Sequence, residues 1–332
     1  MKLILLLSTL SFQLTLSMAT VETTPVIGIL TLHTSPKFGY PDGSTYIYTS
    51  YGKWVEQSEM RWIPISVYES SDVIADKLNK INGVLLTGGN EVMGTKELPS
   101  LYGKVVRQIL DYSINQLNEG NVFPVIGICM GFQSIMVVLS DYEVKLEKVH
   151  NHNESLGMNF TPDTFESYLS LYFSDNQLKA IESQKLFYFH HRDGFTMDQI
   201  NNHPYIKENI KVLGSSVTPK GYEVLSMFQH KHYPVMAVQF HPEKVQFEYY
   251  DGAVINKSEY AMQVNAGFSK VFRRLIGEVQ AKLTTKEVLE YRISVKLEVK
   301  YGKADEAFVF DPENERFPRE EKDTNVDETS DE

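Results

Sequence analysis

Residues 123–132 of this chain read Phe-Pro-Val-Ile-Gly-Ile-Cys-Met-Gly-Phe. The apolar run before the cysteine predicts a buried β-strand, and the apolar residues 132–139 predict a helix. Between them, Gly127 and Gly131 flank Cys129 in the G-x-nucleophile-x-G pattern of a nucleophile elbow, which requires a strand, a tight turn and a helix. We therefore expect an α/β fold in which Cys129 occupies a strained turn after a strand.

Cys129 is the single cysteine among 332 residues. A lone cysteine is most often a small buried hydrophobic residue, but this one lies where a predicted strand runs into a predicted helix. The unpaired N–H groups and the positive dipole end of a helix N-terminus favour a thiolate over a thiol. We therefore interpret Cys129 as a catalytic nucleophile, and we expect its thiolate to form at mildly acidic pH.

A base and an orienting group for this nucleophile follow a strand predicted at residues 235–240, where the sequence reads Phe240-His241-Pro242-Glu243. Residues at i and i+2 of an extended segment project to the same side, so Glu243 can hold the His241 imidazole while its other nitrogen faces sulfur. The alternative is that residues 240–243 form a surface loop whose charged side chains make ion pairs with other parts of the chain. Combined with the elbow, the motif predicts Cys129, His241 and Glu243 as catalytic residues.

Two adjacent glycines close another predicted strand, in the sequence Thr87-Gly88-Gly89. Glycines at the carboxyl end of a strand can expose a backbone N–H to a ligand, so we expect Gly88 to line the substrate site. We assign the N–H groups of Gly89 and Met130 to an oxyanion hole. The alternative reading is a turn without a further role.

The rest of the chain predicts an α/β domain over residues 20–283. Apolar, β-rich segments alternate with amphipathic segments of helix length, which is the pattern of a doubly wound, mostly parallel sheet. Short turns between later strands predict an antiparallel section of that sheet. We expect strands at 26–30, 62–67, 83–86, 123–128, 211–217, 223–228 and 235–240, and helices at 46–58, 72–80, 101–119, 132–139 and 259–283, with Ser70 or Ser71 and Ser258 as helix caps.

Composition narrows the class of ligand. The formal net charge is −11 and no cluster of Lys and Arg is visible, which argues against nucleic-acid binding and favours a small-molecule substrate. No phosphate-binding loop or metal-ligand spacing is present. His150-Asn151-His152 has two histidines without acidic or cysteine neighbours, so we expect a solvated loop there rather than a metal site. We expect no metal and no cofactor.

Residues 1–19 have the pattern of a signal peptide. Lys2 precedes an apolar run from Leu3 to Leu16, and Ser17 and Ala19 match the small-residue cleavage rule. A buried strand or helix is the alternative. The run is too short to span a bilayer, so we expect no stable membrane insertion and a secreted protein or one in a lysosomal or vacuolar lumen. Three sequons, which begin at Asn153, Asn159 and Asn256, are the expected glycosylation sites.

Residues 284–332 form an extension. From Tyr291 to Tyr301, apolar and polar residues alternate with period two, which predicts one half-buried strand. A lone strand is not stable, so this one has to pack on the main domain, add to a sheet edge or pair with a second copy of the chain in a homodimer. The acidic residues after about Lys303 predict a disordered tail.

The elbow, the Gly-Gly turn and the His-Pro-Glu motif together resemble the class I glutamine amidotransferase fold. Within this fold, the chain resembles the folate γ-glutamyl hydrolases, which are cysteine peptidases, from about Val26 to Val279. The resemblance rests on several motifs in the same order. Besides the signal peptide, they are Val26-Ile27-Gly28-Ile29-Leu30, the predicted helix at Tyr46 to Val55, Phe123-Pro124-Val125-Ile126-Gly127 and Tyr233-Pro234-Val235.

This resemblance implies hydrolysis of the γ-linked glutamate chain of folylpolyglutamates through a glutamyl thioester, without a metal or cofactor. It also implies a substrate-binding histidine after an aromatic residue, which matches Phe189-His190, with His191 as the alternative register. Gln133 departs from the pattern, because folate hydrolases often carry Glu four residues after the nucleophile and amidotransferases carry Gln. A neutral amide there binds the glutamyl α-amino and carboxylate groups differently.

Three other functions are compatible with these motifs. The chain could hydrolyse γ-glutamyl peptides or conjugates other than folates, which the amide of Gln133 leaves open. A glutaminase subunit that feeds ammonia to a synthase would be expected in the cytosol, with a synthase domain or partner. A non-catalytic binding protein would not need to keep Cys129, His241 and Glu243.

Overall fold

The computed structural model describes residues 23–34, 40–182, 184–249, 251–279, 281–292, 295–301 and 304–310. The predicted signal peptide and the acidic residues after 310 lie outside this part of the chain. Within it, no helix combines the length and the apolar character needed to cross a membrane.

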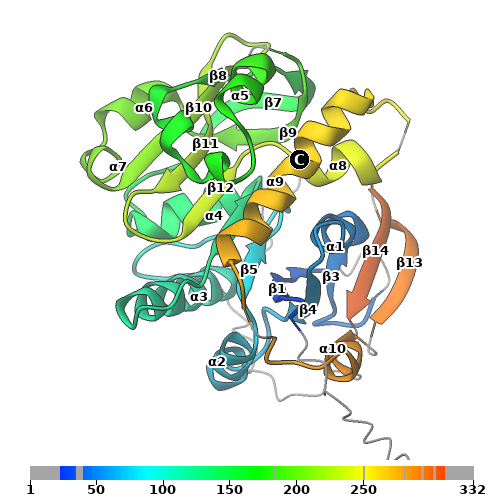
Figure 1. Cartoon of the computed structure of the whole chain (residues 1–332). Helices are drawn as coiled ribbons and strands as arrows, with labels where there is room; N and C mark the ends of the chain where they lie inside the picture. The colour runs from blue at the N-terminus through cyan, green and yellow to red at the C-terminus, as the bar shows by residue number, and fades with distance from the viewer. Residues whose placement is uncertain are drawn as a thin grey trace, which may run out of the picture.

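An eight-stranded sheet forms the centre of the molecule (Figure 1). Its first five strands are parallel to their neighbours, and the last three are joined to the sheet by antiparallel pairing. The doubly wound, mostly parallel α/β fold with an antiparallel section is therefore confirmed. In spatial order the strands are β4 (Arg61–Ile65), β1 (Val26–Leu30), β5 (Gly83–Leu86), β6 (Val125–Ile128), β12 (Val235–Val238), β11 (Glu223–His230), β10 (Ile210–Val217) and β8 (Asn159–Phe160).

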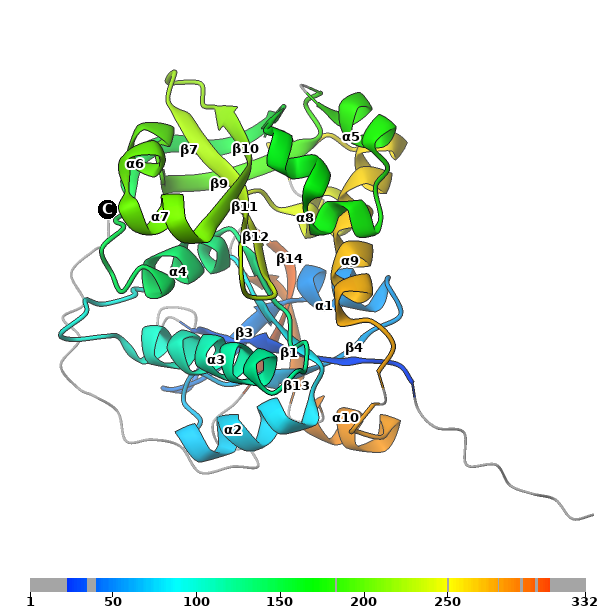
Figure 2. The same cartoon turned by 60° about the vertical axis from the view of Figure 1, so that its left-hand side comes forward.

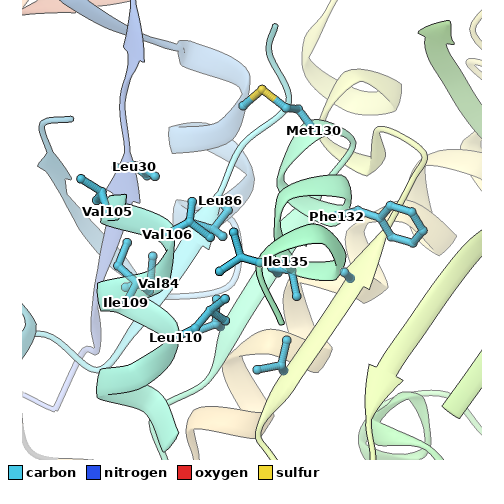
Figure 3. Close-up of a cluster of buried hydrophobic side chains, with 14 of the residues drawn as sticks. Leu30, Val84, Leu86, Val105, Val106, Ile109, Leu110, Met130, Phe132 and Ile135 are labelled. Atoms are coloured by element: carbon cyan, nitrogen blue, oxygen red, sulfur yellow. The ribbon is translucent and has the colours of Figure 1, made fainter. Parts of the chain in front are cut away.

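Helices cover both faces of the parallel strands (Figures 1 and 2). Successive residues of a strand point to opposite faces, so Val84 and Leu86 belong to one buried cluster and Leu85 to another. In Figure 3, side chains of one helical layer meet those of β5. The first face carries α2 (Ser71–Lys80), α3 (Leu101–Asn118) and α4 (Met130–Leu139), and the second carries α1 (Thr49–Glu56), α8 (Pro242–Phe247) and α9 (Glu259–Ile276).

Helix α9 is shorter than expected. Its start is capped as predicted, because the Ser258 hydroxyl accepts the N–H of Ala261. Its end is Ile276 rather than Leu283, because Gly277 has a φ of 73° that a right-handed helix cannot contain. Ser70 occupies the N-cap position of α2, but its side chain makes no capping hydrogen bond.

A second sheet, in the order β13-β14-β3-β2, corrects three expectations. The predicted helix at 46–58 is wrong at its start, because β3 (Thr45–Tyr48) is a strand between β2 (Leu32–His33) and β14 (Ala304–Phe310). In the extension, helix α10 (Thr285–Arg292) precedes β13 (Val295–Tyr301), so the strand begins later than Tyr291. Residues 304–310, where we expected a disordered tail, form β14, which pairs with β3 and β13.

A two-stranded sheet is formed by β7 (Glu147–Leu156) and β9 (Phe187–Gly194), in the part of Figure 1 that also holds β8 and β10 of the central sheet. The His150-Asn151-His152 segment belongs to β7 rather than to a solvated loop. Asn151 is fully buried there, and His152 lies opposite His190 across the two strands. The remaining short elements are η2 (Pro162–Glu166), η3 (Tyr168–Leu171), α5 (Asp175–Ile181), α6 (Met197–Asn202) and α7 (Pro204–Asn209).

Candidate active site

Three neighbouring parallel strands, β5, β6 and β12, end at the same edge of the central sheet. The Gly88-Gly89 turn follows β5, Cys129 follows β6 directly, and His241 follows β12 three residues after its end. Ligand sites of open α/β sheets lie at this carboxyl edge. The fold therefore brings together the three segments that the sequence analysis selected separately.

Cys129 has the backbone geometry of a nucleophile elbow. Its φ of 53° and ψ of −105° are unusual for a residue with a side chain. The turn is held by hydrogen bonds from the Cys129 N–H to the carbonyl of Val238, 2.9 Å, and from the Gly131 N–H to that of Thr87, 3.0 Å. A Cβ on Gly131 would lie 2.1 Å from the carbonyl oxygen of Leu86, so only glycine fits there.

The charge state of Cys129 differs from our expectation. Burial raises the pKa of the thiol to about 12, and the carboxylate of Glu243 adds to this effect. Lys244, the Met130 N–H and the side chain of Gln239 lower the pKa by smaller amounts. Cys129 is 5% exposed, so loss of hydration outweighs the helix N-terminus and the resting group is a neutral thiol.

Glu243 fixes the orientation of the His241 imidazole. The Nδ1 atom of His241 lies 2.7 Å from Oε1 of Glu243, so Nδ1–H donates to the carboxylate and Nε2 keeps a lone pair. Burial lowers the pKa of His241 well below its usual value. Burial also raises the pKa of Glu243 to about 7, against the opposing effect of Lys244. At neutral pH, His241 is therefore an uncharged imidazole that can accept a proton.

The two glycines after β5 differ in what their N–H groups do. The Gly88 N–H donates to the hydroxyl of Tyr51 over 2.8 Å, so it is not free for a substrate. In the described part of the chain, no acceptor takes the N–H of Gly89. A backbone hydrogen bond from Met130 lowers the pKa of Cys129. The N–H groups of Gly89 and Met130 thus stay the predicted donors of an oxyanion hole.

Gln133 shares a hydrogen-bond partner with His191 rather than with His190. Its Nε2 donates to the carbonyl of Asp193, 2.7 Å, and to Oε1 of Gln239, 3.1 Å. The Nδ1 of buried His191 donates to the same Asp193 carbonyl, 2.8 Å. Burial lowers the pKa of His191 to about 4. The alternative register of the predicted substrate histidine is thus the one connected to Gln133.

His190 lies on the other side of β9. Its Nδ1 is 3.0 Å from the Tyr188 hydroxyl, and its ring centroid is 3.9 Å from that of His152.

The asparagines of the three sequons differ in the hydrogen bonds of their side chains. The Asn153 amide donates to the carbonyl of Gly252 and that of Asn256 to Lys185, whereas the side chain of Asn159 is exposed.

Sequence reasoning missed two residues of the site. Gln239 lowers the pKa of Cys129 and accepts from Gln133. It lies two residues before His241, so the alternation that pointed to Glu243 could have identified it as well. Tyr51 contacts Gly88 and lies 3.5 Å from Nδ1 of His241. It belongs to α1, which carries no local signal of a catalytic site.

Comparisons with known proteins agree with this geometry. The family described as glutamine amidotransferase class-I matches residues 47–257. γ-Glutamyl hydrolase 1 of Arabidopsis thaliana is 30% identical over 72% of this chain and 68% of its own length. γ-Glutamyl hydrolase B of Dictyostelium discoideum is 27% identical over 81% and 77%, and the Mus musculus γ-glutamyl hydrolase is 29% identical over 68% and 69%. The chain belongs to the class-I glutamine amidotransferase family and, within that family, to the γ-glutamyl hydrolases.

Proposed function

We propose that this enzyme hydrolyses γ-glutamyl amide bonds with Cys129 as nucleophile, and that its substrate is the γ-linked glutamate chain of a folylpolyglutamate. The supporting observation is the placement of the Cys129 elbow and the His241–Glu243 pair at the ends of adjacent parallel strands. Both lie in a chain of the γ-glutamyl hydrolase family. This arrangement supplies a nucleophile, a base and an orienting carboxylate.

The first half of the reaction forms a thioester. Nε2 of His241 takes the proton of the Cys129 thiol as the sulfur attacks the γ-carbonyl carbon. The carbonyl oxygen becomes an oxyanion that accepts the N–H groups of Gly89 and Met130. The C–N bond then breaks, and the imidazolium returns its proton to the leaving amine nitrogen. The products are a free amine and a glutamyl thioester on Cys129.

The second half regenerates the enzyme. Nε2 of His241 takes a proton from water as the water oxygen attacks the thioester carbon. The C–S bond breaks, the thiol regains its proton from His241, and the γ-carboxylic acid leaves. Glu243 accepts Nδ1–H throughout and stabilises the imidazolium in both halves. The raised pKa of Cys129 makes the sulfur a good acceptor for that returning proton.

Gln133 is proposed to select the glutamyl group. Its Nε2 is used by Asp193 and Gln239, so its Oε1 is left to accept a hydrogen bond from the substrate α-ammonium. An amide oxygen attracts an ammonium less strongly than a carboxylate does, and it repels the neighbouring α-carboxylate less. We infer that other γ-glutamyl peptides or conjugates are the second candidate substrates for this reason.

Product release from purified enzyme tests the function. Pteroylpentaglutamate, γ-glutamyl dipeptides and glutamine are compared at equal concentration, and C129A is the control for each. Faster release from the folate supports the proposal, whereas preference for a dipeptide moves it to the second candidate. Ammonia release from glutamine alone would favour a glutaminase. Because Cys129 is the only cysteine, a mass increase equal to the acyl group in quenched enzyme identifies the thioester.

The location in the cell is also a proposal. It rests on residues 1–19, whose apolar run and small residues fit a cleaved signal peptide. We infer entry into the secretory pathway, with a secreted or lysosomal or vacuolar product. N-terminal sequencing of the mature protein tests this, since an intact Met1 on the active enzyme would contradict it.

A further inference from the structure

Tyr51 connects the two halves of the candidate active site. Its side chain is 1% exposed, and its hydroxyl accepts the Gly88 N–H over 2.8 Å. The same oxygen lies 3.5 Å from Nδ1 of His241. Gly88 belongs to the turn after β5, while His241 follows β12, so one phenol contacts segments more than 150 residues apart in sequence.

The packing around Gly88 shows how closely these groups meet. A Cβ on Gly88 would lie 2.6 Å from the Tyr51 oxygen, 2.8 Å from Cε1 of His241 and 3.2 Å from Cβ of Cys129. All three side chains therefore converge on the space that glycine leaves open. A change in the position of the phenol would move the Gly88-Gly89 turn relative to the nucleophile and the base.

The phenol has one proton, and its direction follows from its neighbours. The oxygen already accepts Gly88 N–H, and Nδ1 of His241 carries a hydrogen that it donates to Glu243. Glu243 raises the pKa of the Tyr51 phenol and the phenol lowers that of Glu243, so the carboxylate is the acceptor toward which we orient the remaining hydrogen. The charged and titratable groups that face Tyr51 are Glu243, Cys129 and Glu248, and Lys244 acts on Glu243.

We propose that Tyr51 is a positioning residue, whose hydroxyl holds the Gly88-Gly89 turn and the Glu243 carboxylate in fixed places around Cys129 and His241. This inference rests on the proposed function and extends it. Burial raises the pKa of Tyr51, and Glu243 raises it further, so the phenol keeps its proton throughout the active pH range. A neutral hydroxyl that both accepts and donates suits this role.

Helix α1 is itself anchored by parts of the chain outside the site. Ser269 of α9 donates to the carbonyl of Trp54, and Ser50 donates to Glu248, the residue that follows α8, over 2.7 Å. On its outer side, Lys53 forms a 2.9 Å ion pair with Glu306 of β14. Figure 1 shows the hairpin of β13 and β14 beside this helix. The tyrosine is therefore placed before any substrate binds, as preorganisation requires.

Y51F is the direct test, because phenylalanine keeps the ring and removes only the hydroxyl. We expect kcat to fall about 10- to 100-fold, since small displacements of reacting groups have effects of this size, and KM to change less than about 2-fold. The hydroxyl lowers the pKa of Glu243, so the acid limb of the pH profile of kcat/KM should move to higher pH. A purely structural tyrosine would not move that limb.

Y112F is the matched control. The hydroxyl of Tyr112 in α3 donates to Oδ1 of Asn79 in α2, over 3.0 Å. This variant also removes one hydrogen-bonded phenol oxygen, and it should leave kcat and the acid limb unchanged. Both variants are compared with wild type by thermal unfolding, so that rates are measured on folded protein. If Y51F keeps wild-type kcat and an unshifted acid limb, Tyr51 has no positioning role.

Alkylation of Cys129 separates this inference from the proposed substrate. The rate of reaction with iodoacetamide needs no γ-glutamyl compound, and Cys129 is the only thiol. We expect Y51F to slow alkylation at pH 7 at least about 5-fold through a displaced base. Slow alkylation in Y51F, with no turnover of any γ-glutamyl substrate by wild type, would sustain the role of Tyr51 and reject the proposed function. Equal alkylation rates would reject the role of Tyr51.

Discussion

Nδ1 of His241 and Oε1 of Glu243 lie 2.7 Å apart where the two side chains are 5% and 0% exposed. Such a buried pair works only when the carboxyl group is ionised, because a protonated carboxyl is a weaker acceptor for Nδ1–H. Burial raises the pKa of Glu243 to about 7. The carboxyl group of Glu243 therefore changes its charge near neutral pH, where a titrating group can control enzyme activity.

E243Q should remove the acid limb of the activity profile. In wild type, kcat/KM should decrease as the pH falls below about 7, because Glu243 takes up a proton there. E243Q resembles the protonated form at every pH, so its profile should be flat across that region, and its kcat at pH 8 about 10- to 100-fold lower. E119Q, at an exposed position of the chain, is the control. An unchanged limb in E243Q would assign the titration to another group.

The backbone of Cys129 predicts an unusual order of stability. Its φ of 53° strains any residue with a Cβ, so C129G should be more stable than C129A by about 1 kcal/mol, although both are inactive. At Ser134, inside helix α4, the order should reverse, because glycine destabilises a helix interior by about 1 kcal/mol relative to alanine. Urea unfolding of the four variants measures both differences. If C129A is the more stable member of its pair, the elbow is not strained.

Occupancy of the three sequons should differ. Asn153 donates to Gly252 and accepts from Tyr188 and Val254, and Asn256 donates to Lys185, so a glycan on either would displace native hydrogen bonds. Asn159 is exposed. In protein from a eukaryotic secretory host, N159Q should lose the glycan mass, whereas N153Q and N256Q should keep it. Loss of mass in N153Q instead would show that the hydrogen bonds of Asn153 do not prevent its modification.

The end of the second sheet should matter for stability. A chain that stops after Ala304 lacks nearly all of β14, so β3 loses one of its two partner strands and Lys53 loses its ion pair with Glu306. We expect a lower unfolding temperature, greater aggregation and reduced activity through α1. A chain that stops after Phe310 keeps β14 and should behave like the full-length protein. Equal behaviour of both truncated chains would show that this sheet contributes little.

Local sequence patterns predicted the parts of the molecule that depend on local interactions. The strands β1 and β5 have the expected bounds, because short apolar runs between turn residues specify buried parallel strands. Cys129, His241 and Glu243 could be selected because each follows such a strand, and the sheet topology brings the strand ends together. The elbow could be predicted from Gly127 and Gly131, the two glycines that flank the nucleophile.

The errors arose where distant residues decide the outcome. Thr45–Tyr48 forms a strand because β14, more than 250 residues later, pairs with it, and nothing in the local pattern indicates that partner. Which of His190 and His191 shares a hydrogen-bond partner with Gln133 depends on the face of β9 that meets Gln133, and substrate binding by either histidine stays a prediction. The pKa of Cys129 depends on burial by the whole domain, which outweighs the local helix terminus.

The position of β14 between β3 and β13 has a consequence for synthesis of the protein. β3 leaves the ribosome early, but its partner strand is among the last described residues to be made. At ~5–20 residues per second, the interval is on the order of 10 to 50 seconds. During that time the nascent chain carries an open strand edge next to the helix that holds Tyr51. The enzyme therefore acquires its complete active-site support only after Phe310 has been made, and chaperones that shield β-edges should bind the nascent chain before that point.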